Sequence, residues 1–341
     1  MDGNTMLGAA FVQTNEPDNR VVAFGRTADG SLTELGSSAT GGKGDAVPHL
    51  TSQGSVLLTG DGRRLLVTNA ASDDLSVLAI SDGGLELLAT VPTGPAPKSV
   101  AERDGLVYVL NTGVPSLAGF RLDAGGIAPI AGSERALAAN ADPAQVGFTP
   151  DGSRIVVTER GADAIETFAV GTDGILGEVR SFASSGPTPY GFAISSGGTL
   201  VVTEAFRAEK GAAAASSYRI DAGTVAPVTA SVGNGRSEIC WAVITPDDRF
   251  AFTTNFADGA VSRYAIGTDG TLVLEDATAG LTKDGRPGLR DEDLTADGAF
   301  LYAIDADAGR IFGWAVGGEG SLAPIGSWGA LPMTVAGLAA S

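Results

Sequence analysis

The 341-residue sequence contains one cysteine, Cys240, and one histidine, His49. A single cysteine cannot form an intramolecular disulfide, which is typical of cytoplasmic proteins. A single histidine excludes a metal site built from several histidines and a catalytic pair of histidines. No run of apolar residues approaches the length of a membrane-spanning helix, and residues 1–5 lack the features of a secretory signal. We therefore expect a cytoplasmic protein with no membrane partner.

Basic residues are also scarce. There are 22 lysines and arginines against 40 aspartates and glutamates, so the net charge is -18. This acidic surface would repel a phosphate backbone, which excludes nucleic acid as a partner. An anionic small molecule would need arginines clustered at its binding site.

The chain is rich in glycine and poor in aromatic residues. The chain has 49 glycines, 43% hydrophobic residues and 6% aromatic residues. Many tight turns between short strands with small packed side chains would have this composition, which favours an all-β fold.

A repeat of about 48 residues runs through the chain. Its clearest unit is an Asp-Gly or Asp-Asp reversal, an apolar stretch and a final Thr-Asn or Thr-Glu, as in residues 61–69, 151–159 and 247–255. Aligning the polar residue that ends the second strand of each unit gives Asn15, Asn69, Asn111, Glu159, Glu204, Asn255 and Asp305. Seven units therefore fill the chain.

Each unit is predicted to form four short strands, the signature of a propeller blade. The first unit has room for three strands only, and residues 333–340 match the inner strand of the other units. We therefore predict one domain, residues 1–341, folded as a seven-bladed β-propeller whose C-terminal strand completes blade one. Ring closure removes exposed sheet edges, so a monomer is expected.

The aligned polar residues are predicted to surround one mouth of the central channel, the usual place for a site. Capping of the following loop is the alternative role for the asparagines. The carboxylates differ, because burying one without a partner is costly. The predicted substrate-binding set is Asn15, Asn69, Asn111, Gln145, Trp241, Asn255, Arg290 and Asp305.

Catalytic roles are predicted for a second set of residues near the same mouth. Glu204 or Glu159 would act as a base, and Arg160 or Arg207 would hold an anion in bidentate fashion. His49 or Tyr190 would assist proton transfer. For His49 the alternative is a solvated loop position, and for Tyr190 it is core packing.

Several segments resemble the bacterial lactonase-type β-propeller family, which includes proteins similar to 6-phosphogluconolactonase and carboxymuconate cyclase. They are residues 11–15, residues 21–24, and Cys240-Trp241 before Thr245-Pro246-Asp247. The resemblance covers the whole chain and implies the seven-bladed fold and lactone chemistry. The family's active members carry a histidine and an Arg-His pair at two inner strands, where this chain has Gln145 and Tyr190.

Three functions follow as hypotheses. The first is a lactonase-like enzyme that opens or closes a small lactone or unsaturated acid by acid–base chemistry, without a cofactor. The second is a hydrolase dependent on Ca²⁺ or Mg²⁺, held in the channel by oxygen ligands. The third is a non-catalytic propeller that binds a ligand or a protein.

Overall fold

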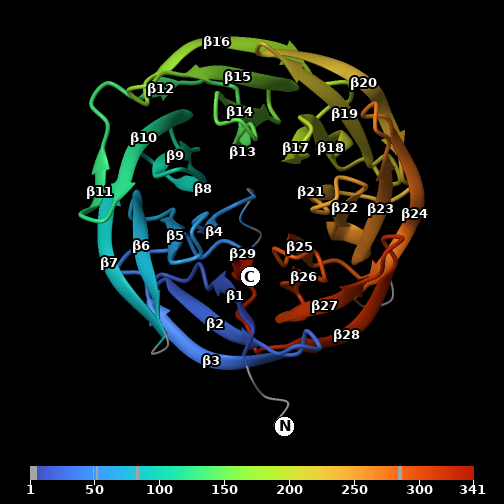
Figure 1. Cartoon of the computed structure of the whole chain (residues 1–341), viewed down its shortest axis with the longest axis horizontal. Coiled ribbons are helices and arrows are strands. Elements are labelled where there is room, and N and C mark those ends of the chain that lie inside the picture. The colour runs from blue at the N-terminus through green and yellow to red at the C-terminus, as the bar shows by residue number, and fades with distance from the viewer. Residues whose placement is uncertain (1–5, 49, 51–52, 82–83, 283–285) are drawn as a thin grey trace.

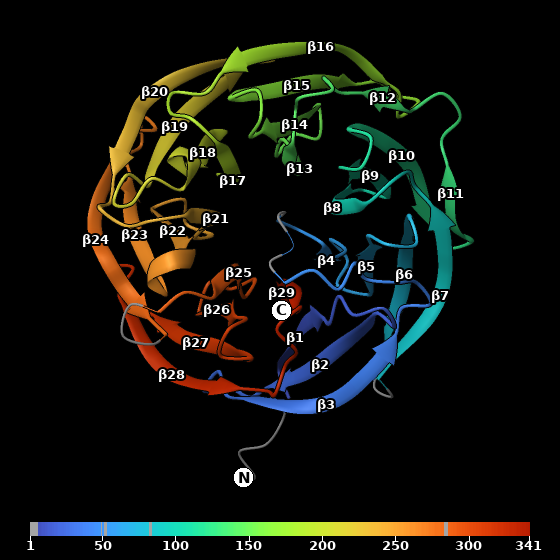
Figure 2. The ribbon, with the colours of Figure 1, turned by 180° about the vertical axis from the view of Figure 1, so that it is seen from behind.

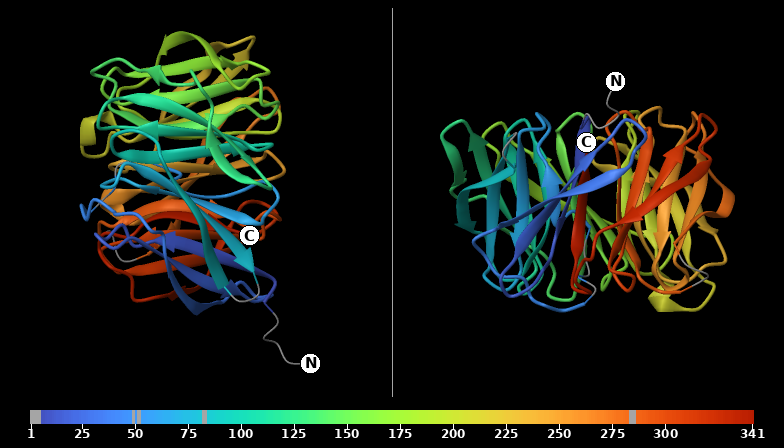
Figure 3. Two further views of the ribbon diagram at one scale, coloured as in Figure 1. Left: turned by 90° about the vertical axis from the view of Figure 1, so that its left-hand side faces the viewer. Right: turned by 90° about the horizontal axis from the view of Figure 1, so that it is seen from below.

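The computed structural model describes residues 6–48, 50, 53–81, 84–282 and 286–341. Their strands form seven antiparallel sheets arranged in a ring (Figure 1). The prediction of a seven-bladed all-β propeller is confirmed. Seen from behind, the innermost strand of every sheet faces the central channel (Figure 2). In side view the strands run between two opposite faces made of loops (Figure 3).

The strands follow one another outward from the channel in six of the blades. Blade two comprises β4 (Val56–Leu58), β5 (Arg64–Asn69), β6 (Asp74–Ser81) and β7 (Gly84–Pro92). Blade three comprises β8 (Pro97–Arg103), β9 (Leu106–Asn111), β10 (Ser116–Asp123) and an outer edge in two pieces, β11 (Gly126–Pro129) and β12 (Arg135–Ala136). Blade four comprises β13 (Pro143–Phe148), β14 (Arg154–Glu159), β15 (Ala164–Val170) and β16 (Leu176–Ala183).

The remaining consecutive blades have the same plan. Blade five comprises β17 (Pro189–Ile194), β18 (Thr199–Glu204), β19 (Ala214–Asp221) and β20 (Thr224–Gly233), with the short 3₁₀ helix η1 (Phe206–Ala208) after β18. Blade six comprises β21 (Ile239–Ile244), β22 (Phe250–Asn255), β23 (Ala260–Ile266) and β24 (Leu272–Leu281), with η2 (Phe256–Asp258) after β22. Blade seven comprises β25 (Leu289–Leu294), β26 (Phe300–Asp305), β27 (Arg310–Val316) and β28 (Leu322–Trp328).

Blade one joins the two ends of the chain. Its order is β29 (Ala336–Ala340), β1 (Gly8–Gln13), β2 (Arg20–Arg26) and β3 (Leu32–Ala39). Ala340 lies opposite Ala10 and Leu338 opposite Val12 in the antiparallel register. The C-terminal strand therefore completes blade one as predicted, and hydrogen bonds between the chain ends close the ring.

The reversal between the first two strands of a blade is stabilised by an aspartate. In blade four, the Thr149 hydroxyl and the Ser153 amide both donate to Asp151 Oδ1, at 2.6 and 3.0 Å. Gly152 has a φ of 70°, a left-handed conformation that glycine adopts at little cost. Because the hydroxyl of Thr149 and the amide of Ser153 stabilise the carboxylate, the pKa of Asp151 falls to about 2. The same threonine–aspartate pair recurs at three other first reversals, at Asp61, Asp247 and Asp297.

The core lies between neighbouring blades. One apolar cluster combines Tyr108 and Leu117 of blade three with Val157 and Phe168 of blade four. Tyrosine hydroxyls reach across the same interfaces, since Tyr302 of blade seven donates to the carbonyl of Gly30 in blade one at 2.6 Å. Burial of both faces of each sheet holds the loops at the mouths in fixed positions.

Candidate functional site

The aligned polar residues end or closely follow the second strand of each blade, as the repeat predicts, but they are buried. Asn69 donates to Asp74 and Ser76 and accepts from Asn19 and Thr40 of the preceding blade. Asn111, Asn255 and Asp305 likewise bond to Thr93, Asn234 and Ala308. These contacts have the geometry of loop capping, the alternative role considered for the asparagines.

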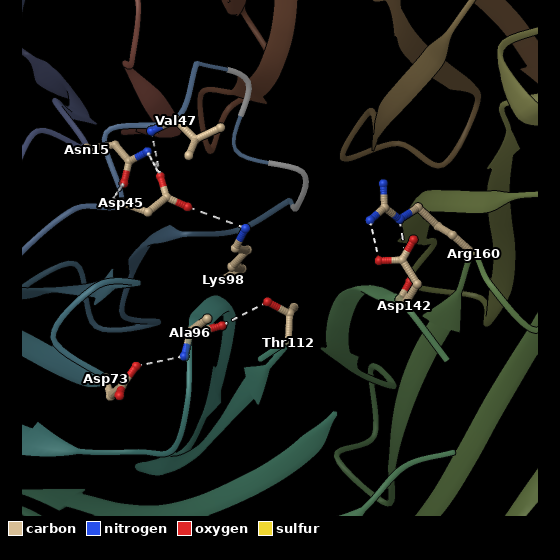
Figure 4. Close-up of polar contacts among 9 residues, drawn as sticks. All are labelled: Asn15, Asp45, Val47, Asp73, Ala96, Lys98, Thr112, Asp142 and Arg160. Carbon is tan, nitrogen blue, oxygen red and sulfur yellow. Dashed lines mark hydrogen bonds and ion pairs between the residues drawn. The ribbon is translucent and has the colours of Figure 1, made fainter. Parts of the chain in front are cut away.

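Asn15 belongs to a polar group on the blade-one side of the mouth (Figure 4). Its side-chain amide donates to Asp45 Oδ1 at 2.8 Å, and Asp45 Oδ2 forms an ion pair with Lys98 at 3.4 Å. Both charges of this pair are thereby neutralised. Asn15 therefore orders the loop around Asp45, and the pair leaves no net charge for a ligand at that position.

Glu204 is a buried carboxylate with many hydrogen-bond partners. Its Oε1 accepts from the Gly186 amide at 2.8 Å and the Ser216 hydroxyl at 2.5 Å, and Oε2 accepts from the Ser231 hydroxyl at 2.7 Å. These donors belong to β19, β20 and the segment entering blade five. The structure places Glu204 in the packing between strands, and the proposed site is not built on it.

Glu159 forms a buried pair with Glu166 on the adjacent strand β15. Both residues are buried, and one oxygen of each, Glu159 Oε1 and Glu166 Oε2, has no partner among the described residues. Burial, with the neighbouring Glu166 as a second cause, raises the pKa of Glu159 to about 8, and burial also raises the pKa of Glu166. The pair therefore retains a proton near neutral pH. Glu159 and Glu166 occupy the positions in blade four that Asn69 and Ser76, which are hydrogen-bonded to each other, occupy in blade two.

Two glutamines join blades at the channel. Gln145 donates to the Phe192 carbonyl and accepts from the Phe192 amide. Its side chain thus makes the two hydrogen bonds that the backbone of a paired strand would make. Gln53, on the blade-two side, makes the same pair of bonds with Ala242 of blade six. Both ends of the Gln145 amide are thus bonded to the backbone of Phe192. The amide is therefore not available for the substrate-binding role predicted from the sequence.

Three consecutive acids of β25 line a channel cavity of about 510 Å³. Burial raises the pKa of Asp291 to about 6 and of Asp293 to about 7, and that of Glu292 well above its usual value. Both carboxylate oxygens of Glu292 lack a partner within the described chain. Nowhere in the described ranges do three acidic, histidine or cysteine side chains converge in a way that would hold a metal ion.

A second cavity, of about 340 Å³, brings together most of the other predicted residues. We call it the arginine cavity. It lies where loops and inner strands of blades four to seven meet. Its charged and aromatic lining includes Arg160, Tyr190, Arg207, Glu238, Trp241 and Arg290. All of these except Glu238 were predicted from the sequence as site residues. Arg160 comes from the turn between β14 and β15 in blade four, and the other four predicted residues belong to blades five to seven.

Arg290 is the most unusual of these side chains. It is 1% exposed, and its guanidinium lies against the Trp241 ring, with Cζ 5.7 Å from the ring centroid. Nη1 donates to the Val335 carbonyl at 3.3 Å, and Nε has no partner in the described chain. A buried guanidinium that forms no ion pair among the described residues brings a positive charge to the cavity wall, which favours an anion there.

The other two arginines are held by aspartates. Arg160 Nη2 donates to Asp142 Oδ1 at 2.6 Å, as Figure 4 shows, and its guanidinium covers the Tyr190 ring. Arg207, in η1, pairs with Asp163 and is 65% exposed. Both arginines line the cavity, and the paired aspartates neutralise their charges.

Cys240 and Tyr190 are neutral in this cavity. Burial raises the pKa of the Cys240 thiol to about 12 and raises that of the Tyr190 hydroxyl above its usual value. The thiol of Cys240 donates to the Glu238 carbonyl at 3.3 Å. Neither residue is therefore a ready nucleophile or base, although Tyr190 can donate a hydrogen bond.

Glu238 is a site residue that the sequence-based predictions missed. It is half-buried, lines the arginine cavity, and its negative charge contributes to the raised pKa of Cys240. Glu238 lies outside the aligned polar positions, just before Cys240-Trp241. Its closeness to that motif was the one feature of the sequence that could have identified it as a site residue. His49, predicted to assist catalysis, lies outside the described residues.

The fold and the match to a known family agree. Residues 126–208 and 205–332 match the family described as lactonase, seven-bladed β-propeller, and the chain belongs to this family. No curated protein matches the chain in sequence. In the described chain, no helix is both long and apolar enough to cross a membrane.

Solved structures with the same fold come from several bacteria. A proposed 6-phosphogluconolactonase of Bacteroides uniformis is 20% identical, with a TM-score of 0.77 over 98% of this chain and 99% of that one. A protein of Lactobacillus plantarum is 17% identical, with a TM-score of 0.80 over 99% and 100% of the two chains. The periplasmic gluconolactonase of Pseudomonas aeruginosa is 17% identical, with a TM-score of 0.75 over 98% of each chain.

Proposed function

We propose that the protein opens or closes a small lactone in the arginine cavity by acid–base chemistry. Membership of the lactonase family supports this class of reaction. The observation that carries the proposal is the buried Arg290 guanidinium, whose Nε has no partner among the described residues and which lines the same cavity as Glu238. An anion-binding group and a candidate base at one cavity are the elements that lactone chemistry requires.

In the opening direction, Glu238 accepts a proton from a water molecule while the oxygen of that water attacks the carbonyl carbon of the lactone. Arg290 stabilises the oxyanion that develops on the carbonyl oxygen. The tetrahedral intermediate then collapses, the bond between the carbonyl carbon and the ring oxygen breaks, and the ring oxygen takes the proton from Glu238. The product is a hydroxy acid, and the reverse sequence closes the ring.

The remaining predicted residues bind and orient the substrate in this proposal. Trp241 and Tyr190 form walls of the cavity, with ring centroids 5.6 Å apart and an interplanar angle of 65°. Arg160 and Arg207 are each paired with an aspartate, so in this proposal Arg290 is the charge that attracts an anionic substrate against the overall charge of -18. No step of this scheme uses a metal ion or another cofactor.

The test is an assay of proton release with a panel of five- and six-membered lactones, with and without a carboxylate. We expect turnover of at least one of them by the wild type. Arg290→Met should lower kcat/KM by roughly 100-fold, the effect of removing one group that stabilises an oxyanion. Arg63→Met, at an exposed turn in blade two, is the matched control and should retain full activity. Absence of turnover with every lactone would overturn the proposal.

Two further predictions stay open. A monomer is expected because the ring leaves no unpaired sheet edge at its closure. A cytoplasmic location is expected from the sequence, although the similar gluconolactonase of Pseudomonas aeruginosa is periplasmic.

A further inference from the structure

Two cavities with different charges meet at the inner strands of the propeller. One is the arginine cavity, and the other is the cavity of about 510 Å³ lined by the three consecutive acids of β25, which we call the acidic cavity. On β25, Arg290 lines the arginine cavity and the next residue, Asp291, lines the acidic cavity. On β21, Trp241 lines the first and Val243 lines the second. The boundary between the two cavities is therefore only about one residue thick.

The side chain of Gln53 lies at this boundary and crosses the channel. Gln53 lines the acidic cavity and comes just before β4 of blade two, and Figure 1 shows β4 and β21 on opposite sides of the channel. Its Nε2 donates to the Ala242 carbonyl at 3.0 Å, and the Ala242 amide donates to its Oε1 at 3.3 Å. Since Ala242 is next to Trp241, Gln53 is bonded to the strand at the point where one cavity gives way to the other.

Gly191 provides the space that the Gln53 side chain occupies. A Cβ atom at position 191 would clash with Gln53 Oε1 and with the carbonyl oxygen of Cys240. A larger residue would therefore displace Gln53 or separate β17 from β21. Tyr190, the residue before Gly191, lines the arginine cavity. Gln53 is thus inserted beside both strands that carry the aromatic side chains of this cavity.

The bonds from Gln53 hold β21 where its pairing within blade six is irregular. The register of β21 with β22 shifts between Ile239 and Ala242, the stretch that contains Cys240 and Trp241. The amide and the carbonyl of Ala242 are both bonded to Gln53, which satisfies the backbone polar groups at the end of this stretch. Gln53 therefore fixes β21 directly after Trp241.

We infer that Gln53 is a positioning residue that closes the floor of the arginine cavity, meaning its wall toward the acidic cavity, so that ligands enter from one mouth of the propeller only. A ligand and any product made from it then share that entrance. The inference goes beyond the proposed function, because it concerns access to the cavity and holds whatever reaction takes place there.

The only cysteine of the chain can report this access without any turnover. Cys240 lines the arginine cavity. Two methanethiosulfonates of similar size, one carrying a trimethylammonium group and one a sulfonate, modify cysteine in the same way. The thiolate attacks the sulfenyl sulfur, methanesulfinate leaves, and a mixed disulfide forms. A reagent that arrives past position 53 must cross the acidic cavity, whose carboxylates attract the cation and repel the anion.

Removal of the Gln53 side chain should therefore accelerate one reagent selectively. We expect Gln53→Ala to raise the rate of Cys240 modification by the cationic reagent roughly 10-fold, and to leave the rate with the anionic reagent within about 2-fold of wild type. Gln53→Met keeps the length of the side chain without its hydrogen bonds and should give a smaller increase of the same sign. Mass spectrometry of the intact protein measures the rates, and circular dichroism checks that each variant is folded.

Gln145→Ala is the matched control. It removes the same pair of side-chain bonds, but between the adjacent blades four and five, which the bond from the Thr158 hydroxyl to the Tyr190 carbonyl still joins. Both reagents should modify Cys240 in this variant at rates close to those of the wild type.

Two results would overturn the inference. The first is an unchanged rate with the cationic reagent in folded Gln53→Ala. The second is an equal acceleration of both reagents, which would indicate general loosening of the structure and not a second entrance. If Gln53→Ala does not fold, the same two rates in Gln53→Met decide. Because no substrate is needed, these results are independent of the lactone assay, and either proposal can fail while the other stands.

Discussion

The guanidinium of Arg160 lies over the ring of Tyr190, with Cζ 4.9 Å from the ring centroid. Arg160 comes from the turn after β14 in blade four, and Tyr190 comes from the inner strand of blade five. The side chain of Arg160 is only 15% exposed and is also held by Asp142. This contact therefore fixes one wall of the arginine cavity across the boundary between two blades.

Arg160→Lys should weaken substrate binding more than it alters the chemical step. Lysine keeps the charge but lacks the flat guanidinium that stacks on Tyr190 and forks around Asp142. We expect KM to rise roughly 3- to 10-fold with kcat within about 2-fold of wild type, and stability to fall by about 0.5–1 kcal/mol. Steady-state kinetics and urea unfolding measure both effects. A loss confined to kcat would contradict this role.

The Glu159–Glu166 pair should make the protein less stable as pH rises. Burial is the main cause that raises the pKa of Glu159 to about 8 in the folded protein, whereas its ordinary value in an unfolded chain is 4.5. Between these two values the folded state holds a proton that the unfolded state has released, so stability falls with increasing pH across that range. Glu166→Gln removes the negative charge of the partner and should reduce this dependence.

Thermal unfolding from pH 5 to pH 8 tests the behaviour of this pair. The variant should lose less Tm than the wild type over that range. Glu134→Gln, at an exposed position in blade three, is the control and should follow the wild type. Parallel curves for wild type and Glu166→Gln would contradict a shared proton.

Asp151 should stabilise the first reversal of blade four at neutral pH but not in acid. The Thr149 hydroxyl and the Ser153 amide lower the pKa of Asp151 to about 2 in the folded protein, whereas its ordinary value in an unfolded chain is 3.8. The stabilisation is therefore complete above the pKa of the unfolded chain and is lost as pH falls toward 2. Because Asp151 is exposed, we expect Asp151→Ala to cost only about 1 kcal/mol at pH 7.

Urea unfolding at pH 7 and pH 2.5 measures this effect. The difference between wild type and Asp151→Ala should shrink at the lower pH. Asp18→Ala, at an exposed position in blade one, should show no such dependence. An equal loss of stability at both values would mean that the charge of Asp151 is not the cause.

The ring could be predicted from the sequence because its signals are local and repeated. A reversal, an apolar strand and a polar strand end recur in each unit, and residues 333–340 supply the missing inner strand. The environment of Asn69, in contrast, could not be predicted from the repeat. Its position at a strand end was predicted, but its burial and its bonds to Asn19 and Thr40 depend on how the preceding blade packs.

The candidate site was predictable in part for the same reason. Tyr190, Trp241 and Arg290 are on or beside inner strands, whose order around the channel follows from the repeat. Glu204 was chosen because it replaces an asparagine in the repeat. Its donors include the Gly186 amide of a loop and the Ser231 hydroxyl of the outer strand β20, whose positions beside Glu204 the repeat does not define. Glu238 lies outside the aligned positions, and its place in the cavity depends on the packing of η2 against Tyr190 and Trp241.

The central claim is that the chemistry takes place in the arginine cavity, with Glu238 as the base. The most direct measurement compares lactone hydrolysis by Glu238→Gln and Glu209→Gln, matched for folded protein, where Glu209 is an exposed residue just after η1. We expect Glu238→Gln to lose roughly 100-fold or more in kcat, the contribution of a general base, while Glu209→Gln stays within about 2-fold of wild type. Full activity in folded Glu238→Gln would contradict it.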